Sequence, residues 1–138
     1  MNQKIVEESV LGIALKDNVA LDHGFTLIDQ VATSVNESWQ PVLGEQATIQ
    51  NVYNQTTYFL LQKETNRNLN IIFRVYDEGV AFRYDVPKQS NLNYFVVSDE
   101  KTHFNLLENH KAFWIPGDYD SQEYAYNETN LSAFPYPQ

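Results

Sequence analysis

Short runs in which apolar and polar residues alternate dominate the chain, and β-branched and aromatic residues fill most of the apolar positions. Asn, Asp, Gly and Pro separate these runs, a pattern typical of an all-β domain, and helical periodicity is nearly absent. The sequence therefore predicts an antiparallel β-sandwich. The predicted strands are Leu11–Leu15, Gly24–Thr33, Gln46–Tyr53, Thr57–Glu64, Leu69–Tyr76, Val80–Val86, Tyr94–Val97, Thr102–Leu106 and Ala112–Ile115.

The clearest predicted hairpin lies in LNIIFRVYDEGVAFRYDV, residues 69–86. Two strand-like runs flank the tripeptide at 77–79, and a type I turn with Gly79 in the left-handed region would close the hairpin. Gly79 is then the residue least replaceable by alanine. Apolar residues fall on both faces of the first run, which suits the middle of a large sheet in a sandwich. Arg83 and Asp85 share one strand face and are expected to form ion pairs with neighbours.

A second hairpin is predicted to join residues 52–53 to residues 58–59 through the polar sequence NQTT. After Ile115, Pro116-Gly117 interrupts the pattern, and a long surface loop is predicted from there on. The printed sequence ends in the aromatic stretch AFPYPQ rather than in polar residues, which indicates a partial domain. Self-association through exposed sheet edges is one expected consequence.

Length and composition exclude several classes of protein. The 138 residues suit one compact domain. The net charge of −9 argues against a nucleic-acid partner, because such binding needs clustered Lys and Arg. The absence of cysteine excludes disulfides and cysteine-based metal sites. No stretch has the length and apolarity of a membrane span, and MNQKIVEESV has no apolar signal region.

The segment WIPGDYDSQEYAYNET, residues 114–129, is unusually rich in carboxylates and aromatic rings. Calcium takes about six to eight oxygen ligands, so the acidic residues of this segment suit a partial cation site. Their spacing does not match an EF-hand loop, and turn formation or solvation is the favoured interpretation of any single carboxylate here. Glu123 differs, because an unpaired carboxylate among aromatic residues would be costly unless a cation or a donor meets it.

This segment and the stretch that follows it contain the aromatic residues Trp114, Tyr119, Tyr124, Tyr126, Phe134 and Tyr136. Such rings pack on apolar sugar surfaces, so these residues are candidates for lining a sugar pocket, Trp114, Tyr119 and Tyr124 first among them. Core filling is the competing interpretation, and it is favoured for Trp114, which lies between Phe113 and Ile115. No spacing identifies the pair of carboxyl groups that glycoside hydrolysis needs.

Three stretches carry a family resemblance: WQPVLGE at 39–45, NIIFRVYDEGVAFRYDVP at 70–87 and HKAFWIPGDYDSQEYAY at 110–126. In order and spacing they closely resemble the N-terminal domain of glycoside hydrolase family 97. The resemblance covers most of the chain, and the second and third stretches are long and specific.

The resemblance implies much that the residues alone do not. Family 97 enzymes are bacterial, exo-acting α-glucosidases and α-galactosidases, and periplasmic export is expected from the family. They combine an N-terminal β-super-sandwich, which is galactose-mutarotase-like, with a catalytic (β/α)8 barrel and a C-terminal β domain. The N-terminal domain packs on the barrel mouth and lends a glutamate to a catalytic calcium ion, a role that motif position gives to Glu123. The acid and the nucleophile or base lie on the barrel, so this chain should not hydrolyse sugars alone.

Three hypotheses remain open from the sequence. The first is a substrate-facing, calcium-assisting part of an enzyme acting on α-glucosides or α-galactosides. The second is a stand-alone carbohydrate-binding β-sandwich with Trp114, Tyr119 and Tyr124 as its platform. The third is a structural domain that orients a barrel. Glucose or galactose preference and stereochemical outcome depend on barrel residues and stay open.

Overall fold

The computed structural model describes residues 4, 6–117, 120 and 123–135. Every strand pairing among them is antiparallel, and no α-helix occurs in that part of the chain, which confirms the predicted all-β class. The elements are β1 (Ile13–Leu15), β2 (Phe25–Trp39), β3 (Ile49–Gln62), β4 (Arg67–Val75), β5 (Val80–Asp85), β6 (Val97–Glu100), β7 (Lys111–Trp114), β8 (Asn127–Asn130) and the 3-10 helix η1 (Leu131–Ala133).

The chain forms two compact units. One comprises Gly12–Lys101, and the other comprises Met1–Leu11 together with Thr102–Gln138. No helix within the described ranges has the length and apolarity that a bilayer span requires.

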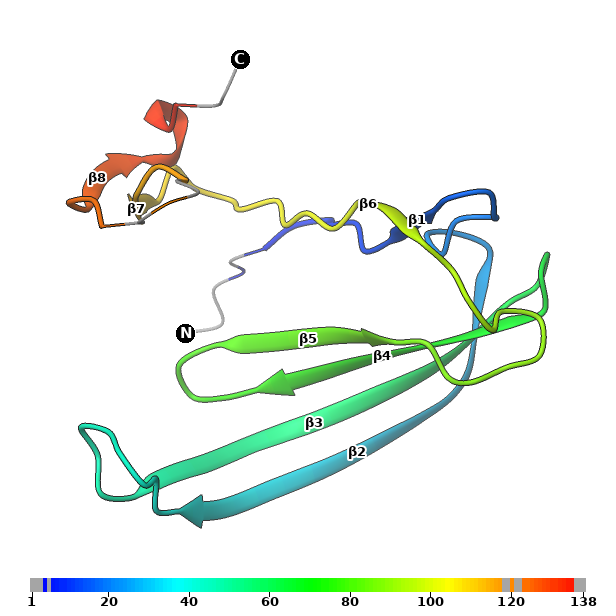
Figure 1. The fold of residues 1–138 in the computed structure, drawn as a ribbon, viewed down its shortest axis with the longest axis horizontal. Helices are drawn as coiled ribbons and strands as arrows, with labels where there is room; N and C mark the ends of the chain where they lie inside the picture. The colour runs from blue at the N-terminus through cyan, green and yellow to red at the C-terminus, as the bar shows by residue number, and fades with distance from the viewer. Residues whose placement is uncertain (1–3, 5, 118–119, 121–122, 136–138) are drawn as a thin grey trace. The chain divides into compact units, whose positions relative to one another are not determined.

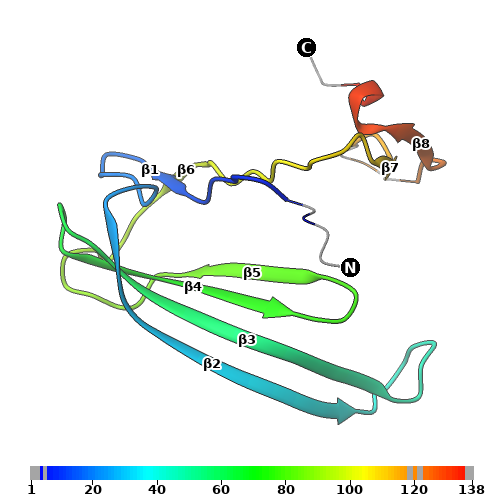
Figure 2. The same cartoon turned by 180° about the vertical axis from the view of Figure 1, so that it is seen from behind.

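The larger unit, Gly12–Lys101, contains a four-stranded sheet in the order β2-β3-β4-β5. The pairing of β3 with β4 ends where Asn54 meets Val75, whereas the pairing of β3 with β2 continues to Ile49 and Trp39. The long hairpin of β2 and β3 therefore extends past the ends of β4 and β5 (Figures 1 and 2).

The predicted hairpin through NQTT is wrong, because residues 54–57 lie inside β3 and pair with strands on both sides. Polar side chains from the neighbouring strands satisfy these turn-prone residues. Ser34 Oγ donates to Asn54 Oδ1 over 2.6 Å, and Arg74 Nε donates to Gln55 Oε1 over 2.9 Å. The reversal between β2 and β3 occurs instead in the connection of residues 40–48.

The predicted hairpin of β4 and β5 is confirmed, with Val75 paired to Val80 and the Tyr76 amide donating to the Gly79 carbonyl over 2.8 Å. The expected role of Gly79 is wrong, because its φ is not in the left-handed region and a Cβ added there would meet nothing within 4 Å. Among the described residues, the left-handed region is occupied elsewhere, for example by Gly24 with φ 71° and Asn66 with φ 54°.

The core of the larger unit lies between one face of the sheet and the short β1–β6 pair. Leu69 on β4 and Leu21 after β1 are each 1% exposed, and they pack with Ile13, Leu15 and Leu92. Two layers therefore meet within this unit, as a sandwich requires. The predicted strand Tyr94–Val97 begins later than expected, since β6 covers Val97–Glu100.

The smaller unit contains the β7–β8 hairpin and η1. The predicted strand Thr102–Leu106 is reduced to isolated bridges from His103 to Val10 and from Leu106 to Val6. The loop predicted after Ile115 is wrong in part, because β8 and η1 lie within it. The sequence of β8, Asn127–Asn130, has no apolar residue, so its strand character comes from pairing with β7.

Candidate site on the β7–β8 hairpin

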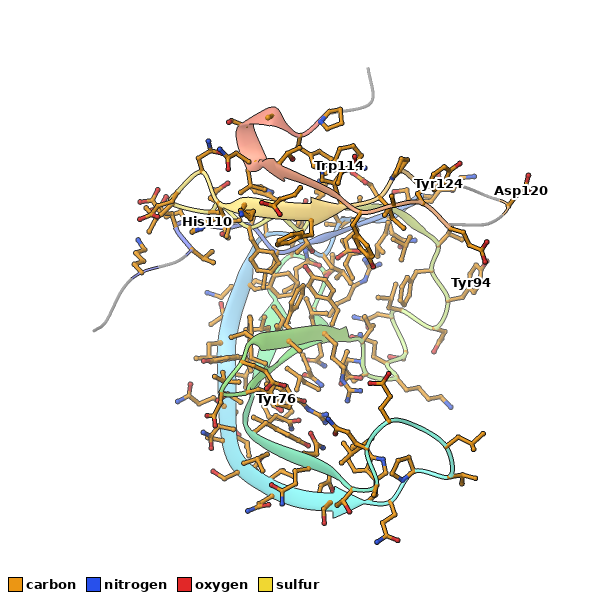
Figure 3. All side chains as sticks on the ribbon, turned by 90° about the vertical axis from the view of Figure 1, so that its left-hand side faces the viewer. Tyr76, Tyr94, His110, Trp114, Asp120 and Tyr124 are labelled. Atoms are coloured by element: carbon orange, nitrogen blue, oxygen red, sulfur yellow. The ribbon has the colours of Figure 1, made fainter. Side chains whose placement is uncertain are left out.

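The segment singled out in the sequence runs between the paired strands β7 and β8. Trp114 pairs with Asn127, so residues 115–126 leave and re-enter the hairpin at neighbouring positions. Alternation along β7 places Trp114 on one face, where it is half-buried, and Phe113 on the opposite face, where it is 65% exposed. Asp120 and Tyr124 lie on the connection between the two strands (Figure 3).

Trp114 is held by contacts within its own unit. Its Nε1 donates a hydrogen bond to Thr129 Oγ1 over 3.1 Å. Its ring meets the Phe134 ring edge-on, with the centroids 4.9 Å apart. Both contacts agree with the interpretation of Trp114 as a packing residue, because they fix the ring against β8 and the residues that follow η1.

Glu123 and Tyr124 are both exposed, with 48% of the Tyr124 surface accessible. The expected desolvation cost for the Glu123 carboxylate therefore does not arise, which corrects that argument for its role. Tyr119, the third predicted sugar contact, lies outside the described residues, as does Asp118.

The donor set for a cation is incomplete in this segment. Within the described residues, no group of three or more His, Asp or Glu side chains gathers in a way that could hold a metal ion. Glu128 pairs instead with Lys111, whose ammonium contacts its carboxylate across the hairpin. Since calcium takes about six to eight oxygen ligands, Glu123 fits as a single contributor to a site completed by other groups.

Sequence reasoning missed one exposed aromatic residue beside this segment, Phe113 at 65% exposure. Phe113 is more exposed than Tyr124, as is Tyr126 at 76%, which is one of the rings considered from the sequence. The strand alternation of KAFW was the available signal, because it places Phe113 opposite the half-buried Trp114.

A separate charged cluster surrounds Asp22 in the larger unit. Lys101 Nζ donates to Asp22 Oδ2 over 2.6 Å, and His23 Nδ1 contacts Asp22 Oδ1. The Lys101 ammonium, followed by His23, holds the pKa of the Asp22 carboxyl below its usual value of 3.8. The His23 ring also lies 3.8 Å from the Glu64 carboxylate. These contacts join the residues that precede β2 to the residues that follow β3 and β6.

The ion pairs expected for Arg83 and Asp85 do not form among the described residues. Asp85 Oδ2 instead accepts a hydrogen bond from Asn70 Nδ2 over 2.8 Å, across the β4–β5 pair. A neutral amide thus satisfies the carboxylate that lies two residues from Arg83.

The fold and the site define an antiparallel β domain that carries an acidic, ring-rich hairpin loop. Residues 1–138 match the family described as Glycosyl-hydrolase 97 N-terminal. The chain belongs to this family, as the three sequence stretches indicated.

Solved structures of relatives agree with this assignment. A glycoside hydrolase family 97 enzyme from Pseudoalteromonas sp. strain K8, in complex with panose, is 31% identical over 96% of this chain and 20% of its own, with a TM-score of 0.86. The same enzyme in complex with acarbose gives a TM-score of 0.85 over 94% of this chain and 20% of its own, at 31% identity. A β-arabinopyranosidase shares the fold at 23% identity, with a TM-score of 0.68 over 80% of this chain and 17% of its own.

A curated relative also agrees with the assignment to a glycoside hydrolase. A probable retaining α-galactosidase of Streptomyces bingchenggensis is 28% identical over 130 residues, which are 94% of this chain and 18% of that protein. The chain thus spans about a fifth of the length of these relatives. It corresponds to part of an N-terminal domain of a glycoside hydrolase.

Proposed function

We propose that this chain is the part of a family 97 α-glycosidase that presents Glu123 to the sugar pocket of the catalytic barrel, as one ligand of a calcium ion. The family match over residues 1–138 supports the parent enzyme class. The observation that carries the residue assignment is the placement of Glu123, exposed on the connection between β7 and β8. The substrates proposed for the parent are α-glucosides or α-galactosides, and a periplasmic location is proposed from the family alone.

The residues of the hairpin have different proposed roles. Glu123 contributes carboxylate oxygens, while the Trp114–Thr129 hydrogen bond and the Trp114–Phe134 contact hold the strands at either end of its segment. Tyr124, next to Glu123 and 48% exposed, is positioned to pack a ring on a sugar, as is proposed also for Tyr119. A bound calcium ion would supply positive charge beside a sugar oxygen. The bond-breaking acid and nucleophile or base belong to the barrel.

The experiment is a calcium titration of activity in the parent enzyme, comparing Glu123→Gln with Glu128→Gln. Glu128 is the matched control, because it is an exposed carboxylate of the same hairpin that pairs with Lys111. Glu123→Gln should raise the calcium concentration needed for half-maximal activity by about tenfold or more, the equivalent of one lost charged ligand. Equal calcium dependence in the two variants would remove Glu123 from the site.

A second candidate function is carbohydrate binding by this chain alone. The exposed rings of Phe113, Tyr124 and Tyr126 favour it, since exposed aromatic residues are the usual platform for sugars. Titration of the chain with maltose and with a galactoside should then shift the ring signals of Tyr124. Unchanged spectra at millimolar sugar would reject stand-alone binding and leave the calcium-assisting part of an enzyme and the structural domain that orients a barrel.

A further inference from the structure

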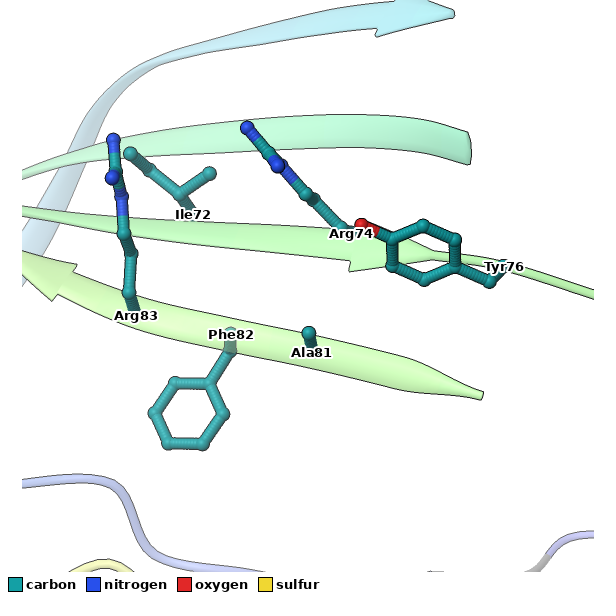
Figure 4. A pocket seen from close by; sticks show the side chains of 6 residues that line it. All are labelled: Ile72, Arg74, Tyr76, Ala81, Phe82 and Arg83. Atoms are coloured by element: carbon teal, nitrogen blue, oxygen red, sulfur yellow. The ribbon is translucent and has the colours of Figure 1, made fainter. Parts of the chain in front are cut away.

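Two arginines lie on one face of the β4–β5 pair, in the larger unit, whereas the hairpin loop that the proposed function uses belongs to the smaller unit. Ile72 pairs with Arg83 and Arg74 pairs with Ala81, so Arg74 and Arg83 are diagonal neighbours on the same sheet face. Diagonal positions place Cβ atoms roughly 7 Å apart. Both side chains project to the same side of the sheet, with Ile72 between them (Figure 4).

The Arg74 side chain is half-buried and held by two contacts. Its Nε donates to Gln55 Oε1 over 2.9 Å, and its guanidinium carbon lies 4.4 Å from the centroid of the Tyr53 ring. The centroid of the Tyr76 ring lies 5.3 Å from the centroid of the Tyr53 ring, so Tyr76 packs against the ring that contacts Arg74. Such a stacked guanidinium loses little further conformational entropy when it binds an anion.

Among the residues that the structure describes, no carboxylate forms an ion pair with either guanidinium. The chain carries 18 acidic residues against 9 basic ones, yet every ion pair found among the described residues uses Lys or His on the basic side. Arg83 is exposed and its side chain makes no hydrogen bond within that part of the chain, and the Asp85 carboxylate accepts a hydrogen bond from Asn70. Two arginines without carboxylates are unexpected at this charge balance.

A cavity of about 200 Å³ lies between them, lined by Ile72, Arg74, Tyr76, Ala81, Phe82 and Arg83. No lining residue is acidic. The volume is below the roughly 300 Å³ at which pockets begin to hold drug-sized ligands, so it suits a small group rather than an oligosaccharide. A carboxylate placed between two guanidinium groups can accept hydrogen bonds from both.

We propose that Arg74 and Arg83 form a binding site for an organic carboxylate that bridges the two guanidinium groups. Ile72 forms the apolar floor of the site and Tyr76 one wall. The carboxylate is supplied either by a free small acid or by a glutamate or aspartate side chain of another polypeptide segment. This site is independent of Glu123 and of the proposed calcium ion.

The test is titration of the 15N-labelled chain with acetate at constant ionic strength, read from the arginine Nε–Hε signals. Acetamide, which has the same shape without the charge, is the ligand control. The signals of Arg74 and Arg83 should shift and saturate with acetate alone. The signal of Arg67 should stay in place, because it lies on β4 but donates to Asn18 Oδ1, and its strand position puts it on the opposite face.

Variants distinguish acetate binding at the Arg74–Arg83 site from a general effect of net charge on the arginine signals. Arg83→Gln should weaken acetate binding at Arg74 by about tenfold or more, whereas Arg83→Lys should restore part of it. Lys88→Gln removes one charge from an exposed residue outside the cavity and should have no effect. Equal weakening by Arg83→Gln and Lys88→Gln, or shifts that do not saturate, would overturn the proposal.

A blocked peptide with a single glutamate distinguishes the two sources of the carboxylate. If it binds about tenfold or more tightly than acetate and its glutamine counterpart does not bind, the site takes a protein side chain. If acetate and the peptide bind equally, the site takes free small acids. Absence of binding by both would overturn the proposal without bearing on Glu123.

Discussion

The indole nitrogen of Trp114, on β7, donates a hydrogen bond to the hydroxyl oxygen of Thr129, on β8, over 3.1 Å. This bond joins the two strands between which the Glu123 segment runs. Thr129→Val keeps the side-chain shape and removes the acceptor, so it should destabilise the hairpin by about 1 kcal/mol. Hydrogen exchange of the Trp114 indole and of the β7–β8 amides should accelerate, while the Trp39 indole on β2 serves as an internal control. Unchanged exchange at Trp114 would show that the bond contributes nothing.

Gly12 is the glycine whose replacement should cost most among those with a described environment. A Cβ added there would lie 2.5 Å from the Asp22 Cβ and 3.1 Å from the Asp22 Cα, so the backbone must shift. Gly12→Ala should lower the free energy of unfolding by about 1–3 kcal/mol, measured by urea denaturation. Gly79→Ala is the matched control, since nothing lies within 4 Å of its added Cβ, and it should be neutral or slightly stabilising. Equal denaturation midpoints for both variants would contradict this account.

The β4–β5 hairpin shows which features of the fold a local sequence pattern can predict and which it cannot. Alternation and the DEG tripeptide predicted the β4–β5 hairpin, because its strands and turn are adjacent in the chain. The turn geometry depends on backbone angles that several residue types adopt. The tripeptide therefore did not determine the backbone conformation of Gly79, which is not in the left-handed region. The strand character of residues 54–57 and of β8 comes from partners 13 or more residues away, and no local pattern indicates it.

The candidate site was predictable to a similar degree. The composition of the 114–129 segment identified an acidic, aromatic loop, and the structure places Glu123 and Tyr124 on its surface. The exposure of each ring depends on the strand face that it occupies, and Phe113 and Trp114 lie on opposite faces of β7. The residues suggested a cation or a donor beside Glu123, and the family resemblance gave this residue its expected role as a ligand of a catalytic calcium ion.

Asp22 should make folding sensitive to acid. Because Lys101 and then His23 lower its pKa in the folded chain, the charged carboxylate stabilises the fold fully above pH 3.8, and this contribution is lost as the pH falls through the lowered value. Asp22→Asn should therefore be less stable than the wild type at pH 7, and the difference should shrink as the pH falls from about 5 toward about 2. Urea denaturation across this range measures it. Asp99→Asn, at an exposed position on β6, should show no such trend.

Gln62 should be the most costly polar residue to replace. It is fully buried, and its Nε2 donates to the carbonyls of Ala20 and His23 over 2.7 and 3.1 Å, while its Oε1 accepts from Thr65. Gln62→Met leaves these groups without a partner and should cost about 2 kcal/mol or more. Gln50→Met, at an exposed position of the same strand, should change the unfolding free energy by less than about 0.5 kcal/mol. A neutral Gln62→Met would contradict the assigned bonds.

The outer edge of β2 should promote self-association of the isolated chain. Within the described residues β2 pairs only with β3, and its 15 residues contain neither proline nor lysine, which commonly protect sheet edges. Sedimentation at increasing concentration should show oligomers. Val31→Lys, on the edge strand, should reduce them more than Val52→Lys on β3, and a monomer at high concentration would reject the prediction.

The most direct test of the central claim is the calcium content of the parent enzyme after equilibrium dialysis against a low, fixed calcium concentration. The account predicts that Glu123→Gln retains clearly less calcium than the wild type, whereas Glu128→Gln retains the same amount. Equal calcium content in all three proteins would show that the exposed carboxylate between β7 and β8 is no ligand, and the proposed role of this chain in the sugar pocket would be contradicted.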